Sequence, residues 1–163
     1  MERLDRLSVV KEYVQVGSVL GREFNFTLLA ATLDRPEAEI TAALDQLVKA
    51  GLLSCVGHPP DAIYSFKHSL IRDAAYESML KRRCQHWHSR VASTIESEFP
   101  LIADHEPEIL ALHYANSDFN EQSLKYWVKA ADLSLDQFNL SEAVDKTSNG
   151  LQQAALILSL IHI

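Results

Sequence analysis

The stretch that decides the fold runs over residues 34–66 and reads DRPEAEITAALDQLVKAGLLSCVGHPPDAIYSF. Residues 34–37 form a helix-start signal, with a side-chain acceptor, an early proline and a glutamate three positions after the aspartate. Apolar residues then recur every three or four positions, as in a helix with one buried face. The pattern changes to two short β-type runs, 52–56 and 62–66, on either side of the turn cluster 57–61. We therefore expect a helix followed by a β-hairpin.

The residues before this stretch add two more helices. Apolar side chains between Leu4 and about Val19 have helical spacing, and Phe26–Thr32 forms a short second helical segment after an interruption at 21–24. Three helices followed by a β-hairpin is the order of a winged helix. The sequence therefore predicts a winged-helix domain over residues 1–67.

The residues after the stretch are helical in pattern. Apolar side chains recur over 69–80, and the residues Trp87, Val91, Ile95 and Phe99 follow at steps of four until Pro100 ends that helix. A helical hairpin is expected over 106–116 and 120–134, and a last helix begins after Asn139. The last two helices resemble each other loosely at a distance of about 20 positions, which indicates the start of a stacked-helix array. The predicted fold class is mainly α: a winged helix with a small β-hairpin, a connecting helical segment (68–100), and α-helical hairpins of tetratricopeptide-like type (101–163).

Composition excludes several classes of function. The net charge of the 163 residues is −7, which speaks against a phosphate-backbone binder and against a membrane-surface anchor. The two cysteines, Cys55 and Cys84, do not make a disulfide framework or a cysteine-ligated zinc site, and we expect them to be buried thiols. No apolar run approaches the roughly 20 residues that span a bilayer, so we expect a cytoplasmic chain with no membrane partner.

The sequence contains no motif for nucleotide binding or catalysis. Its five glycines do not cluster into GxxxxGK[ST] or GxGxxG, and the GxSxG elbow of hydrolases is missing. His86 and His88 are two positions apart on one helix and cannot chelate one ion, while His105 and His113 are expected to be surface or partly buried histidines. We therefore expect no catalytic, cofactor-binding or metal site in this chain, and no enzyme activity of its own.

Three stretches carry a resemblance to a known family: Gly21-Arg22-Glu23-Phe24, 43–53 (ALDQLVKAGLL) and 64–80 (YSFKHSLIRDAAYESML). They resemble the region that follows the NTPase module in large bacterial signalling proteins. Those proteins carry a class III adenylate or guanylate cyclase domain, an AAA-like ATPase of the STAND type, and tetratricopeptide repeats. The resemblance covers about residues 4–155, and its motifs are packing motifs, so the family's cyclase and ATP-binding residues have no counterpart here. It implies that ATP belongs to a longer parent protein and not to this chain.

The resemblance implies a non-catalytic role in signal transduction. The chain would be a regulatory and interaction segment of a cytoplasmic ATPase or nucleotide cyclase. It would couple an upstream ATPase module, present in cis, to a repeat array that binds an unknown protein or peptide. The segment 155–163 (ALILSLIHI) is apolar nearly all round, whereas a terminal repeat is normally capped by polar residues. Either further repeats are missing or the last six or so residues are not native to the family, and we expect the chain to be a fragment.

Five residues near the join between the predicted halves are candidate contacts to the ATPase module. In related ATPases a histidine of the winged helix can reach the bound nucleotide, and the resemblance points to His68 for this position. Arg72 and Asp73 are expected to form a structural ion pair, with an inter-domain latch as the alternative. Arg82 and Arg83 belong to the basic run 81–83, which we place at a helix C-terminus, where it could also contact an acidic surface.

Three aromatic residues are candidates for the partner-binding surface of the array. Tyr114, Tyr126 and Trp127 lie on predicted helix faces, where core packing is the favoured interpretation. The alternative is that they line the surface on which helical arrays bind peptides.

A DNA-binding transcriptional regulator is the alternative function, because winged helices often bind DNA. The helix that would enter the major groove, 36–50, carries Glu37, Glu39 and Asp45 against a single Lys49. The turn region 56–62 contains no lysine or arginine. Nucleic acid is therefore not expected as a partner.

Overall fold

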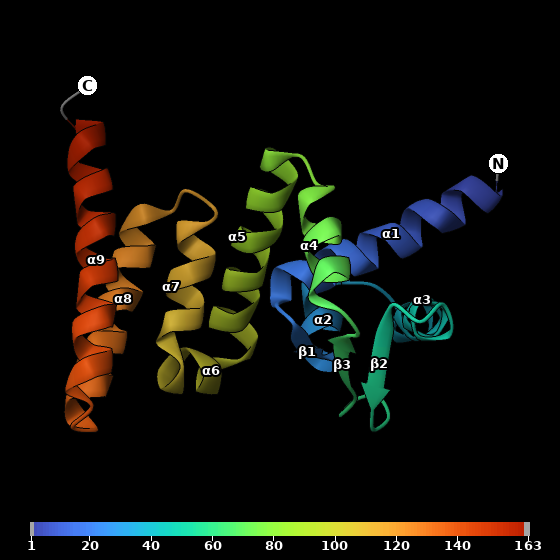
Figure 1. Cartoon of the computed structure of the whole chain (residues 1–163), viewed down its shortest axis with the longest axis horizontal. Helices are drawn as coiled ribbons and strands as arrows, with labels where there is room; N and C mark the ends of the chain where they lie inside the picture. Colours follow the sequence, from blue (N-terminus) through green and yellow to red (C-terminus); the bar gives the residue numbers. More distant parts are fainter. Residues whose placement is uncertain (1, 162–163) are drawn as a thin grey trace. The chain divides into compact units, whose positions relative to one another are not determined.

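The computed structural model describes the backbone of residues 2–161 and the side chains of residues 10–161. Within this part the chain is mainly helical and contains a small antiparallel sheet of three strands, which confirms the mainly α prediction (Figure 1). The chain forms two compact units, unit 1 (Met1–Trp87) and unit 2 (His88–Ile163). The division at 67 and 100 that the sequence suggests stays a prediction.

Unit 1 contains the predicted helices and hairpin, together with one strand that was not predicted. Its helices are α1 (Glu2–Leu20), α2 (Phe26–Leu33), α3 (Glu37–Lys49), α4 (Ser69–Glu77) and the start of α5 (Lys81–Glu98). Its strands are β1 (Glu23–Asn25), β2 (Leu53–Val56) and β3 (Ile63–Phe66), and the sheet has the antiparallel order β1-β3-β2.

The additional strand β1 occupies the interruption that the sequence places at 21–24. Phe24 pairs in register with Tyr64 of β3, and their rings stack with centroids 5.9 Å apart. Gly21 has φ +144°, a conformation that glycine adopts readily, and it turns the chain from α1 into β1. A Cβ atom on Gly17 would lie 2.9 Å from the Phe24 ring, so α1 and β1 approach as closely as they do because residue 17 is glycine.

The core of unit 1 combines side chains from α1, α2, α3 and the sheet. The predicted apolar face of α3 is buried, with Ile40 and Leu44 fully inaccessible to solvent. Burying one such side chain contributes about 1.5–3 kcal/mol to stability. The other fully buried large residues of this core are Tyr13, Val16, Phe26, Leu29, Thr32, Leu53 and Tyr64. The core fixes α1 against α3, and the site described below is lined by α1, by Arg35 ahead of α3 and by the junction of α4 with α5.

Unit 2 consists of helices in sequence. After residue 88 of α5 come α6 (Pro100–His105), α7 (Pro107–Ala115), α8 (Asn120–Asp136) and α9 (Leu140–Ile161). The predicted hairpin and last helix are confirmed, whereas α6 was not predicted. Pro100 does end α5, but it also begins α6, because proline at the first helical position leaves no N–H unpaired.

The turn from α8 to α9 passes through Phe138, which has φ +57° and is 91% exposed. Its N–H donates to the carbonyl of Leu135, and the N–H of Asn139 donates to the carbonyl of Ser134. This pair of hydrogen bonds ends α8. None of the described helices has the length and hydropathy that a membrane crossing requires.

Candidate functional site

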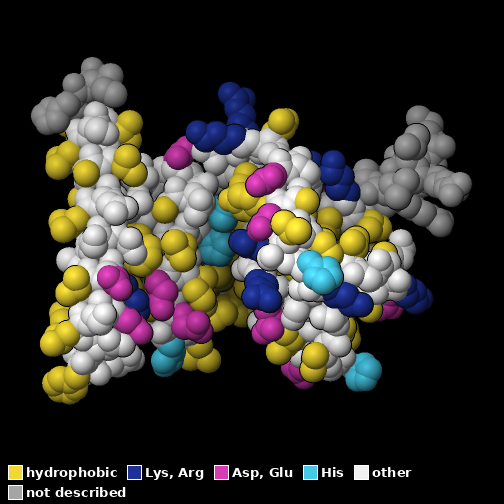
Figure 2. Space-filling view, viewed as in Figure 1, with side chains coloured by type: hydrophobic (Ala, Val, Ile, Leu, Met, Phe, Trp, Pro, Cys, Tyr) yellow, Lys and Arg dark blue, Asp and Glu magenta, His cyan; other side chains and the backbone are white. Residues whose placement is uncertain are grey.

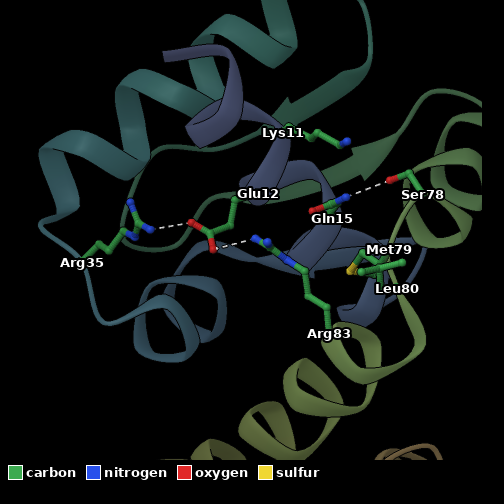
Figure 3. A pocket seen from close by; sticks show the side chains of 8 residues that line it. All are labelled: Lys11, Glu12, Gln15, Arg35, Ser78, Met79, Leu80 and Arg83. Atoms are coloured by element: carbon green, nitrogen blue, oxygen red, sulfur yellow. Dashed lines mark hydrogen bonds and ion pairs between the residues drawn. The ribbon is translucent and has the colours of Figure 1, made fainter. Parts of the chain in front are cut away.

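Unit 1 carries a polar cleft beside α1, which we call the Glu12 cleft (Figure 3). The cleft has a volume of about 500 Å³ and lies between α1, Arg35 in the segment that leads into α3, and the junction of α4 with α5. Its lining residues are Lys11, Glu12, Gln15, Arg35, Ser78, Met79, Leu80 and Arg83. Three of these are cations and one is a carboxylate, so the lining is positively charged.

Helical spacing on α1 brings Lys11, Glu12 and Gln15 to the same side of that helix. Gln15 is 4% exposed, and its Nε2 donates a 2.8 Å hydrogen bond to Oγ of Ser78. Because Ser78 follows directly on α4, this bond ties α1 to the end of α4 and sets one wall of the cleft.

The carboxylate of Glu12 holds two arginines from different parts of unit 1. Its Oε2 accepts from Nη2 of Arg35 at 2.5 Å, and its Oε1 accepts from Nη2 of Arg83 at 3.0 Å. Glu12 is 17% exposed, whereas the side chains of Arg35 and Arg83 are 33% and 48% exposed. Charge-assisted bonds of this kind fix the geometry of both guanidinium groups, and each guanidinium keeps donors that Glu12 does not use.

Arg35 is held from its other side by α3. Its Nη1 donates to Oε1 of Glu39 at 3.0 Å, and the hydroxyl of Tyr13 donates to the same oxygen at 2.9 Å. The hydrogen bond to Glu39 raises the pKa of Arg35, and the bonds from Tyr13 and then from Arg35 lower the pKa of Glu39. Burial, followed by the bond to Glu39, raises the pKa of Tyr13 to about 12. These shifts keep Arg35 positively charged, Glu39 negatively charged and Tyr13 neutral at neutral pH.

The arrangement is suited to binding an anionic group. Arginine presents a planar fork of donors that matches a carboxylate or a phosphate, and Lys11 adds a third positive charge. The lining contains no cysteine or histidine that could serve as a nucleophile or base. Over the described residues, no three His, Cys, Asp or Glu side chains come together to hold a metal ion.

Of the five predicted contact residues, Arg83 is the one that lines the cleft. The placement of the run 81–83 at a helix C-terminus is wrong, because α4 ends at Glu77 and the run begins α5. The turn at 78–80 separates the two helices, whereas the apolar pattern appeared to continue through it. Arg82 is exposed and is not among the lining residues.

The remaining predicted contacts lie around α4. The expected ion pair between Arg72 and Asp73 is present at 3.5 Å, and Nε of Arg72 also donates to the carbonyl of Ser18 at 3.3 Å. His68 is exposed and precedes α4 without a side-chain capping bond. An inter-domain role for these residues stays a prediction.

Sequence reasoning missed Glu12 and Arg35. Glu12 lies on a helix that was identified only by its apolar positions, and its partner Arg83 is 71 positions away. Arg35 was assigned to a helix-start signal, and the available clue was its i,i+4 spacing to Glu39.

In unit 2, Glu96 of α5 joins two of the predicted aromatic residues. The hydroxyl of Tyr114 donates to Oε2 of Glu96 at 2.6 Å, and the hydroxyl of Tyr126 donates to Oε1. The two rings stack with centroids 5.8 Å apart and are 7% and 5% exposed. The bonds from Tyr114 and then Tyr126 lower the pKa of Glu96. The structure thus confirms core packing, the interpretation that the sequence favoured; Trp127 is also buried and lines a groove between α8 and α9.

Unit 2 also contains a buried histidine pair that the sequence did not reveal. The Nδ1 atoms of His88 and His113 lie 2.8 Å apart, and the two side chains are 6% and 7% exposed. The expectation of surface or partly buried residues is wrong for His113, because partners 25 positions apart on α5 and α7 do not appear in local spacing.

The expectation of buried thiols is wrong for Cys55, which is exposed on strand β2.

Comparison with curated proteins finds a sequence that is similar to this chain. A curated, uncharacterized protein of Rhizobium meliloti (strain 1021) is 25% identical over 142 residues, which is 86% of this chain. The chain spans only 14% of the length of that protein. No family model matches, and no solved structure matches.

Proposed function

We propose that this chain is a non-catalytic regulatory and interaction segment of a larger cytoplasmic signalling protein, an ATPase or nucleotide cyclase that supplies the ATP site. In this proposal α1 to α3 with the β2–β3 hairpin form a winged helix, and α7 to α9 begin a tetratricopeptide-like array. The winged helix binds the upstream ATPase module, and the array binds a partner protein.

The observation that carries the proposal is the charge and geometry of the Glu12 cleft. Two guanidinium groups are oriented by one carboxylate, and the side chains that carry them are 33% and 48% exposed. Glu12 and Glu39 together supply two carboxylates against the three lining cations, so an aspartate or glutamate of a docked module would complete the pairing. Arg83, which the sequence had assigned to such a contact, is one of the two oriented arginines.

Two further observations support a segment of a longer protein. The resemblance described above covers nearly the whole chain, and none of the family's ATP-binding residues has a counterpart in it. The match to the Rhizobium meliloti protein occupies 14% of that protein's length, which is the arrangement that the proposal requires.

The charges on α3 favour this proposal over the DNA-binding alternative. The first turn of α3 carries Glu37 and Glu39, and its last turn carries Lys49 as the basic residue. Carboxylates on a groove-reading helix would repel the phosphate backbone. The turn between β2 and β3 offers no lysine or arginine to offset them.

The test begins by sequencing the coding DNA on both sides of this reading frame, where the proposal expects an upstream Walker A motif. Binding of that ATPase module to this chain is then measured for Arg83→Glu and for Arg82→Glu. These neighbours differ in that Arg83 lines the cleft and Arg82 does not. We expect Arg83→Glu to weaken binding at least about tenfold, equal to about 1.4 kcal/mol, and Arg82→Glu to change it less than about twofold. Equal effects of the two variants, or no ATPase module upstream, would refute the proposal.

A further inference from the structure

Unit 2 has an apolar groove between its last two helices. Helices α8 and α9 pack side by side (Figure 1). The groove along them has a volume of about 280 Å³. Its walls include Val128 and Leu135 from α8 and Leu151 from α9, which are 52%, 49% and 67% exposed. Covering apolar side chains of this size removes their surface from water, which is favourable, so an exposed group of them marks a binding surface.

Gly150 of α9 lines the groove and lies close to side chains of α8. A Cβ atom on Gly150 would lie 3.4 Å from Cβ of Trp127 and 3.6 Å from Cδ1 of Leu124. Trp127 is 6% exposed and forms part of the groove lining. The tryptophan therefore supplies a rigid floor, and the aliphatic residues on either side supply the walls.

The apolar residues of α9 continue beyond the groove in a regular seam. Steps of four and three residues connect Leu140, Val144, Thr147, Leu151, Ala154, Leu158 and Ile161. The large members of the seam are between 57% and 70% exposed. Figure 2 shows hydrophobic side chains along the length of α9. A repeat of 3.5 residues on one side of a helix is the pattern that packs against another helix, and it extends too far for a small ligand.

The charge around the groove selects the kind of helix that fits. Residues 88–163 contain eleven acidic and four basic residues. Asp132 lines the groove, and the lining Lys146 is already paired with Glu108 at 3.5 Å and Glu142 at 3.6 Å. A second copy of this chain would bring the same excess of negative charge to the contact. A helix with basic residues beside its apolar face would be attracted.

We propose that the α8–α9 groove binds one amphipathic helix of a partner protein, with apolar residues at i, i+3 or i+4, and i+7, and lysine or arginine on both flanks. This inference rests on the proposed function, because it names the class of partner that the array binds. A helix of about 15 residues, roughly 22 Å long, would cover the groove and the neighbouring part of the seam.

The test uses the full chain and two labelled synthetic peptides of 16 residues. Both peptides have leucine in the i, i+4, i+7 pattern; one has lysine at all flanking positions and the other has glutamate. Fluorescence anisotropy should show the lysine peptide binding at least tenfold tighter than the glutamate peptide. Leu151→Gln should weaken binding of the lysine peptide at least tenfold, because it replaces an apolar wall by an amide. Leu101→Gln on α6 is the matched control, since Leu101 is 72% exposed and lies outside the groove, and it should leave the affinity within twofold.

Three results would overturn the inference: equal binding of both peptides, equal effects of the two substitutions, or no binding of the lysine peptide. Light scattering that shows a dimer lost in Leu151→Gln would assign the groove to a second copy instead. The outcome is separable from that of the proposed function, because Arg83→Glu changes unit 1 and should leave peptide binding unchanged. Loss of peptide binding in Leu151→Gln with normal ATPase binding would locate the defect in the groove alone.

Discussion

The contact between His88 and His113 predicts that unit 2 loses stability as the pH falls below neutrality. Burial, followed by the charge of His88, lowers the pKa of His113 to about 3, whereas a histidine in an unfolded chain titrates near about 6.5. Between these two values the unfolded chain binds a proton that the folded unit does not bind. The stability from this group is therefore fully present above about pH 6.5 and is lost progressively as the pH falls toward about 3.

The size of the effect follows from the same two pKa values. A difference of one bound proton changes the free energy of unfolding by about 1.4 kcal/mol for each pH unit inside the window. Only the upper part of the window is crossed between pH 7 and pH 5, so the expected loss is about 2 kcal/mol. That is a large share of the about 5–15 kcal/mol by which domains are usually stable.

Urea unfolding followed by tryptophan fluorescence measures this loss. The chain has two tryptophans, one in each unit, so a Trp87→Phe background makes the signal report unit 2 through Trp127. His113→Gln removes the titrating ring and should flatten the change between pH 7 and pH 5 by about 2 kcal/mol. His58→Gln, an exposed histidine of unit 1, is the control and should leave the slope unchanged. The reasoning is refuted if His113→Gln keeps the pH dependence of the parent chain.

Three other perturbations should give clear results. Glu96→Ala leaves two buried tyrosine hydroxyls without their acceptor and should lower the free energy of unfolding by about 2–4 kcal/mol, measured by urea unfolding, whereas an unchanged midpoint would contradict the described bonds. Gly17→Ala places a methyl group 2.9 Å from the ring of Phe24 and should destabilise unit 1 by about 1–3 kcal/mol in thermal unfolding; a stabilised variant would contradict that close approach. A thiol reagent should modify exposed Cys55 before the half-buried Cys84, as peptide mass spectrometry after short reaction times can show, and the reverse order would refute the placement of strand β2.

The parts of the fold that were predicted correctly are those that local sequence determines. The three- and four-residue spacing within 37–49 and the Gly-His-Pro-Pro-Asp turn at 57–61 locate α3 and the hairpin without reference to distant residues. Strand β1 has three residues, and its pairing partner lies about 40 positions later on β3. A strand this short forms because tertiary pairing stabilises it, so its own residues carry little signal.

The candidate site divides in the same way. Arg83 stood out because it belongs to a run of basic residues, and local composition was enough to single it out. Its partner Glu12 became significant only when α1 and the start of α5 came together in the folded unit. The pair of His88 and His113 depends equally on folding, because the two residues lie 25 positions apart and on different helices. Long-range pairs of charged or polar side chains are therefore what the sequence alone could not show.

The turn between α8 and α9 has a consequence for the folding of unit 2. The two hydrogen bonds across this turn form a Schellman motif, in which the residue with positive φ is usually glycine. Here that residue is Phe138, and a left-handed conformation costs a residue with a side chain roughly 1–2 kcal/mol. The ring is 91% exposed, so little burial offsets the cost. The packing of α8 on α9 therefore has to offset the conformational free energy that Phe138 costs. The hairpin owes its stability to the contacts between its two helices, and the turn itself opposes it.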